Sequence, residues 1–161
     1  MYRESPNIFR EVPGAACFLE RLRSFDNART AIATGCWLSE ALFKLHASGL
    51  TVGDIPLATS DDDRNRKNIM QIAFEKALDF YACSRFKSVV YVGDGPWDLQ
   101  ASRSLGYSFI GIGSRIKGVK DTDAICWHQD FRDVEAVLAS ISALLKPCLA
   151  YLVTVSGEVK M

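Results

Sequence analysis

The sequence lacks a long apolar run, an excess of one charge and a regular cysteine framework. Its 161 residues include 19 basic and 19 acidic side chains, so the formal net charge is zero. No basic block is present, which argues against a nucleic-acid partner. The apolar runs are too short to span a bilayer, so we expect no membrane partner either. The first residues contain no apolar stretch typical of a secretory signal, and we expect a cytoplasmic protein.

The five cysteines are odd in number and widely spaced, without a Cys-x-x-Cys pair: Cys17, Cys36, Cys83, Cys126 and Cys148. This distribution is typical of reduced cytosolic thiols rather than of a disulfide framework or a zinc site. Hydrophobic residues make up 48% and charged residues 24%, as in ordinary globular proteins. The length then predicts a single domain over residues 1–161, with enough chain for a core.

Hydrophobic periodicity predicts helices that alternate with short apolar strands. The predicted helices cover residues 15–25, 37–48, 66–83, 96–105 and 134–145, and the strands cover 31–33, 57–59, 88–92, 109–112 and 124–127. The buried stripe of the second helix should contain Leu38, Ala41, Leu42 and Leu45, and that of the third Ile69, Met70, Ala73, Ala77 and Phe80. This alternation predicts an α/β fold with a mostly parallel sheet between two helical layers. Such folds bind ligands at the carboxyl ends of their strands.

Thr34 and Gly35 directly follow the first predicted strand. A hydroxyl group followed by backbone amides at a helix N-terminus suits a phosphoryl oxygen. The alternative is that Thr34 only caps the next helix.

Asp94 and Asp98 lie where the strand at 88–92 gives way to a helix. Pro96 suits only an opening helical position, which places Asp98 in the first turn. Both carboxylates should then face the strand-end crevice, where they would suit Mg²⁺. The alternative is that Asp94 caps the helix and Asp98 interacts with its dipole. Trp97, between them, would either wall the crevice or pack against neighbours.

Arg66 opens the helix at 66–83, in phase with its buried stripe, whereas Lys67 should point toward solvent. A cation at this crevice would hold a phosphate and steady the carboxylates. The alternative is an ordinary surface arginine. Taken together, a hydroxyl, a cation and two carboxylates at successive strand ends predict an electrostatic cradle for phosphoryl transfer.

Residues 89–101 and 105–113 closely resemble the fourth motif of the haloacid-dehalogenase (HAD) superfamily of hydrolases, in particular its phosphoglycolate-phosphatase-like members. Residues 31–35 resemble the second motif, and residues 12–22 resemble the helix that leads into it. Arg66 falls where the third-motif cation is expected, although the family more often has lysine. The resemblance covers roughly residues 12–140.

The resemblance implies a three-layer, Rossmann-like HAD core that hydrolyses a small phosphorylated metabolite with Mg²⁺. The family forms an aspartyl-phosphate on the first Asp of an Asp-x-Asp motif, and the second Asp is the acid/base. Carried over, Thr34 binds the phosphoryl group, with the Gly35 backbone beside it, and Arg66 neutralises charge.

By the same resemblance, Asp94 and Asp98 hold the metal directly or through water, and the backbone of Gly95 lies at the bound group. The sequence thus contains the residues expected to bind the metal but not the Asp-x-Asp motif that supplies the nucleophile, because no Asp-x-Asp precedes Thr34. Two candidates elsewhere, residues 61–63 and 121–123, follow no convincing strand. We therefore expect the nucleophile, the first strand and the cap to be missing from the chain, and Mg²⁺ binding to be weakened.

Three explanations for the missing motif remain open. The chain starts late and is part of a phosphatase that is incomplete at its N-terminus, which we favour; or it is a pseudoenzyme that binds phosphate or a protein; or another chain supplies the strand. A generic receiver-like domain is less favoured because its acidic cluster is also missing. The absent strand would leave two unpaired strand edges, which invite pairing in a homo-oligomer. The apolar tail at 148–155 is the candidate to fill that position instead.

Overall fold

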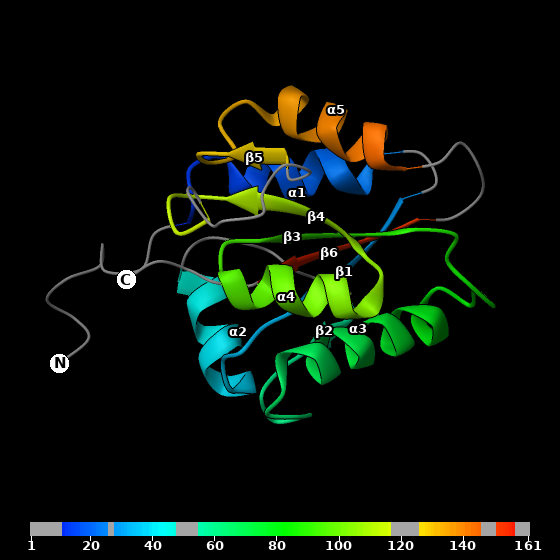
Figure 1. Ribbon diagram of the computed structural model, residues 1–161. Coiled ribbons are helices and arrows are strands. Elements are labelled where there is room, and N and C mark those ends of the chain that lie inside the picture. Colours follow the sequence, from blue (N-terminus) through cyan, green and yellow to red (C-terminus); the bar gives the residue numbers. More distant parts are fainter. Residues whose placement is uncertain (1–10, 26–27, 48–54, 117–125, 146–150, 157–161) are drawn as a thin grey trace, which may run out of the picture.

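A six-stranded parallel sheet forms the centre of the protein (Figure 1). The computed structural model describes residues 11–25, 28–47, 55–116, 126–145 and 151–156. The strands lie in the order β2-β1-β6-β3-β4-β5, and every neighbouring pair is parallel. Their bounds are β1 Ala28–Ala33, β2 Leu57–Ala58, β3 Val89–Gly93, β4 Ser108–Ile112, β5 Cys126–His128 and β6 Tyr151–Ser156. The predicted α/β class and parallel sheet are therefore confirmed.

Helices cover both faces of this sheet, which makes three layers (Figure 1). The helices are α1 Ala15–Arg23, α2 Leu38–Ala47, α3 Arg66–Phe80, α4 Pro96–Leu105 and α5 Val134–Leu144. One core cluster joins α1 and α5 to Val90 and Val92 of β3, and the other joins α3 and α4 to Val89 and Tyr91 of the same strand. Alternate residues of β3 thus enter opposite cores, as expected for a strand that is buried on both faces.

Local sequence signals set the ends of the two helices nearest the candidate site. Helix α4 begins at Pro96, whose missing N–H group is tolerated there, and ends at Gly106 with φ 71°. Helix α3 begins after Asn65, whose side chain accepts a hydrogen bond from the Lys67 amide. These caps place Arg66 and Asp98 in the opening turns of neighbouring helices.

Strand β6 lies between β1 and β3, in the position that the sequence resemblance leaves empty. Its register pairs Ala33 of β1 with Ser156, and Val92 of β3 with Val155. The tail therefore fills this central position, as one of the two sequence-based alternatives predicted, while residues 148–150 lie outside the described part. Because both neighbouring edges are paired within the chain, the expected reason for association through them is removed.

Two predicted buried stripes are wrong in part. On α2 only Ala41 and Leu45 are buried, whereas Leu38 and Leu42 are 44% and 47% exposed. On α3 the predicted stripe is buried except for Phe80, which is 52% exposed near the helix end. Periodicity identified both helices but overestimated the width of their contact with the sheet, because α2 lies at the margin of the molecule (Figure 1).

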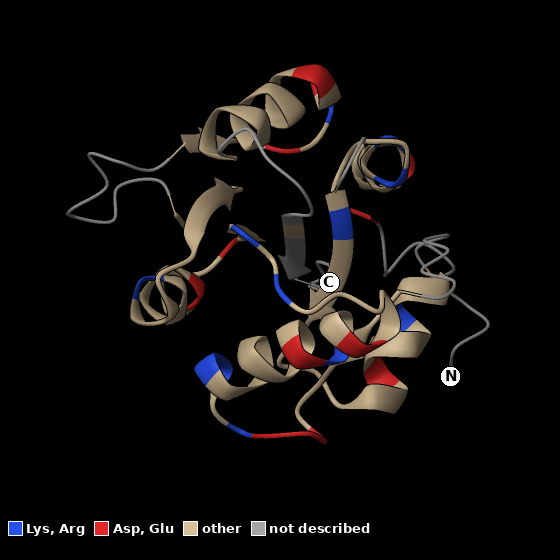
Figure 2. Ribbon diagram, turned by 90° about the vertical axis from the view of Figure 1, so that its right-hand side faces the viewer, with Lys and Arg blue, Asp and Glu red and all other residues tan. Residues whose placement is uncertain are grey.

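Acidic and basic residues are interspersed over the helices and loops rather than gathered by sign (Figure 2). This distribution agrees with the zero formal charge of the chain. Within the described ranges, no helix is both long and apolar enough to cross a membrane.

Candidate functional site

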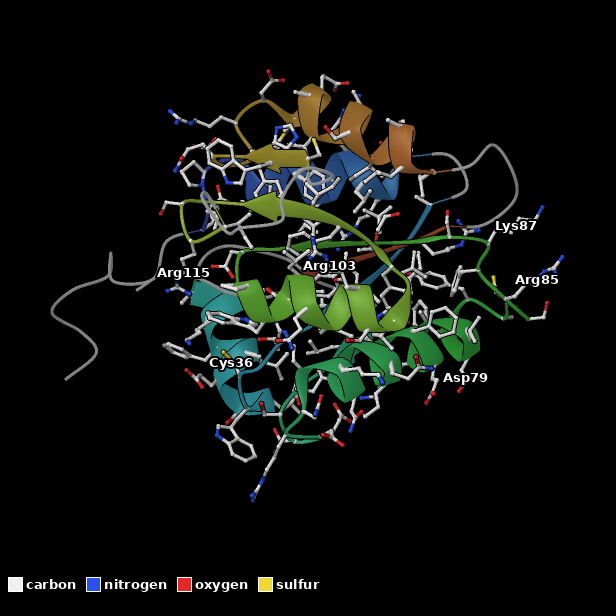
Figure 3. All side chains as sticks on the ribbon, in the orientation of Figure 1. Cys36, Asp79, Arg85, Lys87, Arg103 and Arg115 are labelled. Atoms are coloured by element: carbon white, nitrogen blue, oxygen red, sulfur yellow. The ribbon has the colours of Figure 1, made fainter. Side chains whose placement is uncertain are left out.

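The loops that follow β1, β3 and β4 meet at one end of the sheet, because parallel strands share the direction of their carboxyl ends. Cys36, in the loop after β1, and Arg115, after β4, both lie at this end (Figure 3). Asp79, Arg85 and Lys87 lie at the opposite end. The structure thus brings the sequence-predicted segments together at the expected edge.

Arg66 and Asp98 form the ion pair at the centre of this cluster. Arg66 Nε donates to Asp98 Oδ1 over 2.6 Å, and the two side chains are 13% and 0% exposed. Asp98 Oδ2 also accepts a hydrogen bond from the Gly95 amide, 3.3 Å away. Arg66 is therefore not a surface arginine, and its charge is balanced by a carboxylate removed from water. Removing one partner of such a pair leaves the other as an uncompensated buried charge, which destabilises the folded protein.

This pairing changes the position expected for Asp98. The side chain does not face an open crevice, because one oxygen holds Arg66 and the other closes the first turn of α4. The alternative interpretation, a stabilising contact at the helix N-terminus, describes part of what is found. Gly93 makes room for this arrangement, since a Cβ atom there would lie 2.7 Å from Asp98 Oδ2.

Asp94 lies next to Arg115, with 3.6 Å between Asp94 Oδ2 and Arg115 Nη1. The Asp94 side chain is 12% exposed and that of Arg115 is 56% exposed. Sequence reasoning missed Arg115, although the residue follows β4 by three positions and the strand-end rule applies to that loop too. A second cation thus faces the candidate site from the loop after β4.

The fit of Mg²⁺ depends on Asp94. Among the residues that the structure describes, no group of three or more His, Cys, Asp or Glu side chains is arranged to hold a metal ion. Asp98 would have to release Arg66 to become a direct ligand. Mg²⁺ accepts one carboxylate when waters and a phosphate complete its shell. The donor set therefore fits Asp94 as the direct ligand and Asp98 as a residue that positions its loop.

The Thr34-Gly35 loop lies directly beside this ion pair. Thr34 is fully buried, and its Oγ1 accepts a hydrogen bond from the Cys36 amide over 3.2 Å. That contact leaves the hydroxyl proton as a donor. Gly35 is exposed, and a Cβ atom built on it would lie 3.5 Å from Arg66 Nη1. The guanidinium group therefore lies near the loop after β1 while it binds the first turn of α4.

Thr34 does not cap helix α2, although the alternative interpretation predicted that it would. The Leu38 amide, at the start of that helix, donates to Asp61 Oδ2. Asp61 belongs to the acidic run at residues 61–63, which the sequence analysis considered only as a poor Asp-x-Asp candidate. The run is ordered, because Asp62 also accepts from Lys76 and from the Thr59 amide. Burial alone would raise the pKa of Asp62, but these hydrogen bonds lower it below its ordinary value.

The Trp97 indole packs over the backbone of Gly95. A Cβ atom at residue 95 would overlap the ring atoms Cε2, Cζ2 and Nε1. The ring is nevertheless 44% exposed, so it is not part of the core. Packing against a neighbour, the second alternative for Trp97, is thus found, and a role as wall of the strand-end crevice stays a prediction.

Comparison with known proteins adds no family assignment: no protein-family model matches the chain, and no curated protein matches it.

Proposed function

We propose that this chain is a HAD-like phosphohydrolase domain whose strand-end site binds the phosphate of a small phosphomonoester with Mg²⁺. The observation that supports the proposal is the position of Arg66. Its guanidinium group binds Asp98 in the first turn of α4 and lies beside Gly35 in the loop after β1. These are the two segments whose sequences resemble the second and fourth motifs of the family.

In this proposal each residue has a separate task. The exposed Gly35 contacts the phosphoryl oxygens, the buried Thr34 shapes this loop through the Cys36 amide, and Asp94 is the direct ligand of Mg²⁺. The Arg66–Asp98 pair holds the two loops at a fixed separation. When bound, Mg²⁺ supplies positive charge that stabilises the phosphoryl oxygens. The chain itself orients the phosphate and limits its contact with water.

The domain alone should not turn over its ligand. Hydrolysis in the family passes through a carboxylate nucleophile, and β6, which lies between the two motif-bearing strands, has the sequence YLVTVS without an Asp. This observation also favours a second candidate function, a non-catalytic phosphate- or protein-binding module on the same fold. In that case β6 is a permanent replacement for a catalytic strand.

Binding is tested by thermal unfolding of the full chain with inorganic phosphate and Mg²⁺, separately and together. We expect the combination to raise Tm more than either alone, because ligands that bind the folded state stabilise it. The Asp94→Asn variant should lose the Mg²⁺-dependent part of the shift. Asp79→Asn is the matched control, since Asp79 is exposed at the opposite end of the sheet (Figure 3). Equal shifts in wild type and Asp94→Asn would refute the site.

The two candidate functions differ in one measurable respect. An N-terminally extended form that contains an Asp-x-Asp strand should hydrolyse a generic aryl phosphate with Mg²⁺ if the domain belongs to a phosphatase. The present chain should release no phosphate under the same conditions. An extended form without that motif, or with the motif and no turnover, would favour the binding module.

A further inference from the structure

A cavity of about 460 Å³ lies between the N-terminal end of α3 and helix α4. Its volume falls within the range of small-molecule sites. Its walls combine cationic, amide and aromatic side chains, including Arg64, Arg66, Lys67, Trp97 and Gln100. It lies beside the strand-end site and shares Arg66 and Trp97 with it.

The charge of this cavity is positive. Among the described residues that line it, three are cations and none is a carboxylate. Asp98 balances Arg66, which leaves the exposed side chains of Arg64 and Lys67 to face a ligand. The nearby Asp63 keeps its negative charge, and its two oxygens accept from the Asn65 amide and from Asn68 Nδ2. The N-terminus of the 15-residue helix α3 adds the positive end of its dipole.

The aromatic wall of the cavity is a flat, partly exposed ring. Trp97 contributes an indole that is 44% exposed, and its other side lies against the backbone of Gly95. The indole therefore contacts the backbone on one side and lines the cavity with its exposed part. Exposed indole rings bind planar aromatic groups by stacking, with little dependence on their identity.

We propose that this cavity binds a mononucleotide, with the phosphate at Arg64 and Lys67 and the base against Trp97. Two independent features favour this ligand class. The cations select a phosphate, and the exposed indole selects a planar ring within the same small volume. A ligand with only one of these groups leaves half of the wall without a partner. The inference does not depend on the proposed phosphohydrolase activity.

The test is a calorimetric titration of the full chain with AMP, adenosine and ribose 5-phosphate. We expect AMP to bind about tenfold more tightly than either fragment, and its affinity to fall as salt is raised. Trp97→Ala should weaken AMP binding by about tenfold, while Trp37→Ala, at another exposed tryptophan, should leave it unchanged. The double variant Arg64→Gln/Lys67→Gln should also weaken it by about tenfold. Its control is Arg85→Gln/Lys87→Gln at the opposite end of the sheet (Figure 3).

Several results would overturn the proposal. Absence of AMP binding, or equal loss of affinity in the test and control variants, would remove the cavity as a nucleotide site. Ribose 5-phosphate binding as tightly as AMP would show that the indole contributes nothing. Loss of AMP binding in Asp94→Asn but not in Trp97→Ala would place the ligand at the strand ends instead. That last outcome would still be compatible with the proposed phosphohydrolase site.

Discussion

Replacing Arg66 by methionine should destabilise the protein more than any other single change of a charged residue discussed above. The substitution keeps much of the apolar stem but leaves Asp98, which is 0% exposed, as a buried charge without its cation. Loss of one partner from a buried pair costs about 3–5 kcal/mol. For a chain of this size, that loss corresponds to a fall in Tm of roughly 6–20 °C. Urea denaturation followed by circular dichroism measures the free energy of unfolding.

The matched control is Arg21→Met. Arg21 forms an ion pair with Glu135 at 2.7 Å, close to the 2.6 Å of the buried pair, but the two side chains are 51% and 72% exposed. Water screens that pair, so we expect a much smaller change. The double variant Arg66→Met/Asp98→Asn should recover part of the loss, because the buried charge is then gone. If Arg66→Met and Arg21→Met lower stability equally, the buried pair does not hold the two loops together.

Three further changes test other parts of the structure. Leu152→Ala should lower the free energy of unfolding by about 2–5 kcal/mol, because Leu152 of β6 is fully buried, whereas Leu42→Ala, at an exposed leucine, should have little effect in the same urea assay. Gly93→Ala should cost about 1–3 kcal/mol and reduce the phosphate-dependent Tm shift, since its Cβ atom would displace Asp98; an unchanged shift would contradict the packing of this turn. Burial raises the pKa of Tyr107 to about 12, so the unfolded chain, with a tyrosine pKa of about 10, loses this proton first. Stability should therefore fall as pH rises from about 10 to about 12, and less so in Tyr107→Phe.

The fold was largely predictable because its local signals agree with each other. Pro96 and Gly106 marked the ends of α4 to the residue, and the apolar runs located the strands. The central position of β6 was harder to predict, because β6 is the last strand in the sequence but lies between β1 and β3 in the sheet. Periodicity also says nothing about how much of a helix the sheet covers, and so Leu42 and Phe80 were placed inside.

The candidate site was predictable as a set of strand ends but not as a set of contacts. Spacing brought Arg66 and Asp98 to the same edge of the sheet, yet only the three-dimensional packing shows that they bind each other. The hydrogen bond from the Leu38 amide to Asp61 was not predictable from the sequence either, because the two residues are 23 positions apart. Arg115 was not predicted because it lies two residues beyond the family-like segment that ends at residue 113, although the loop after β4 reaches the same edge.

Strand β6 lies between β1 and β3, where an N-terminal Asp-x-Asp strand would also have to lie. The two strands should therefore compete for this position, and experiments can measure that competition. Strand β6 pairs with β1 over six residues and with β3 over four, so its removal would expose both strands and the core around Leu152. Deleting residues 148–161 should therefore abolish folding or make the chain associate through the freed edges. A shortened chain that stays monomeric and equally stable would refute the structural role of β6. If an N-terminal Asp-x-Asp strand restores both stability and phosphatase activity to the shortened chain, the central position accepts either strand. The Asp-bearing strand would then gain its catalytic role by displacing β6, since the sheet has one place between β1 and β3.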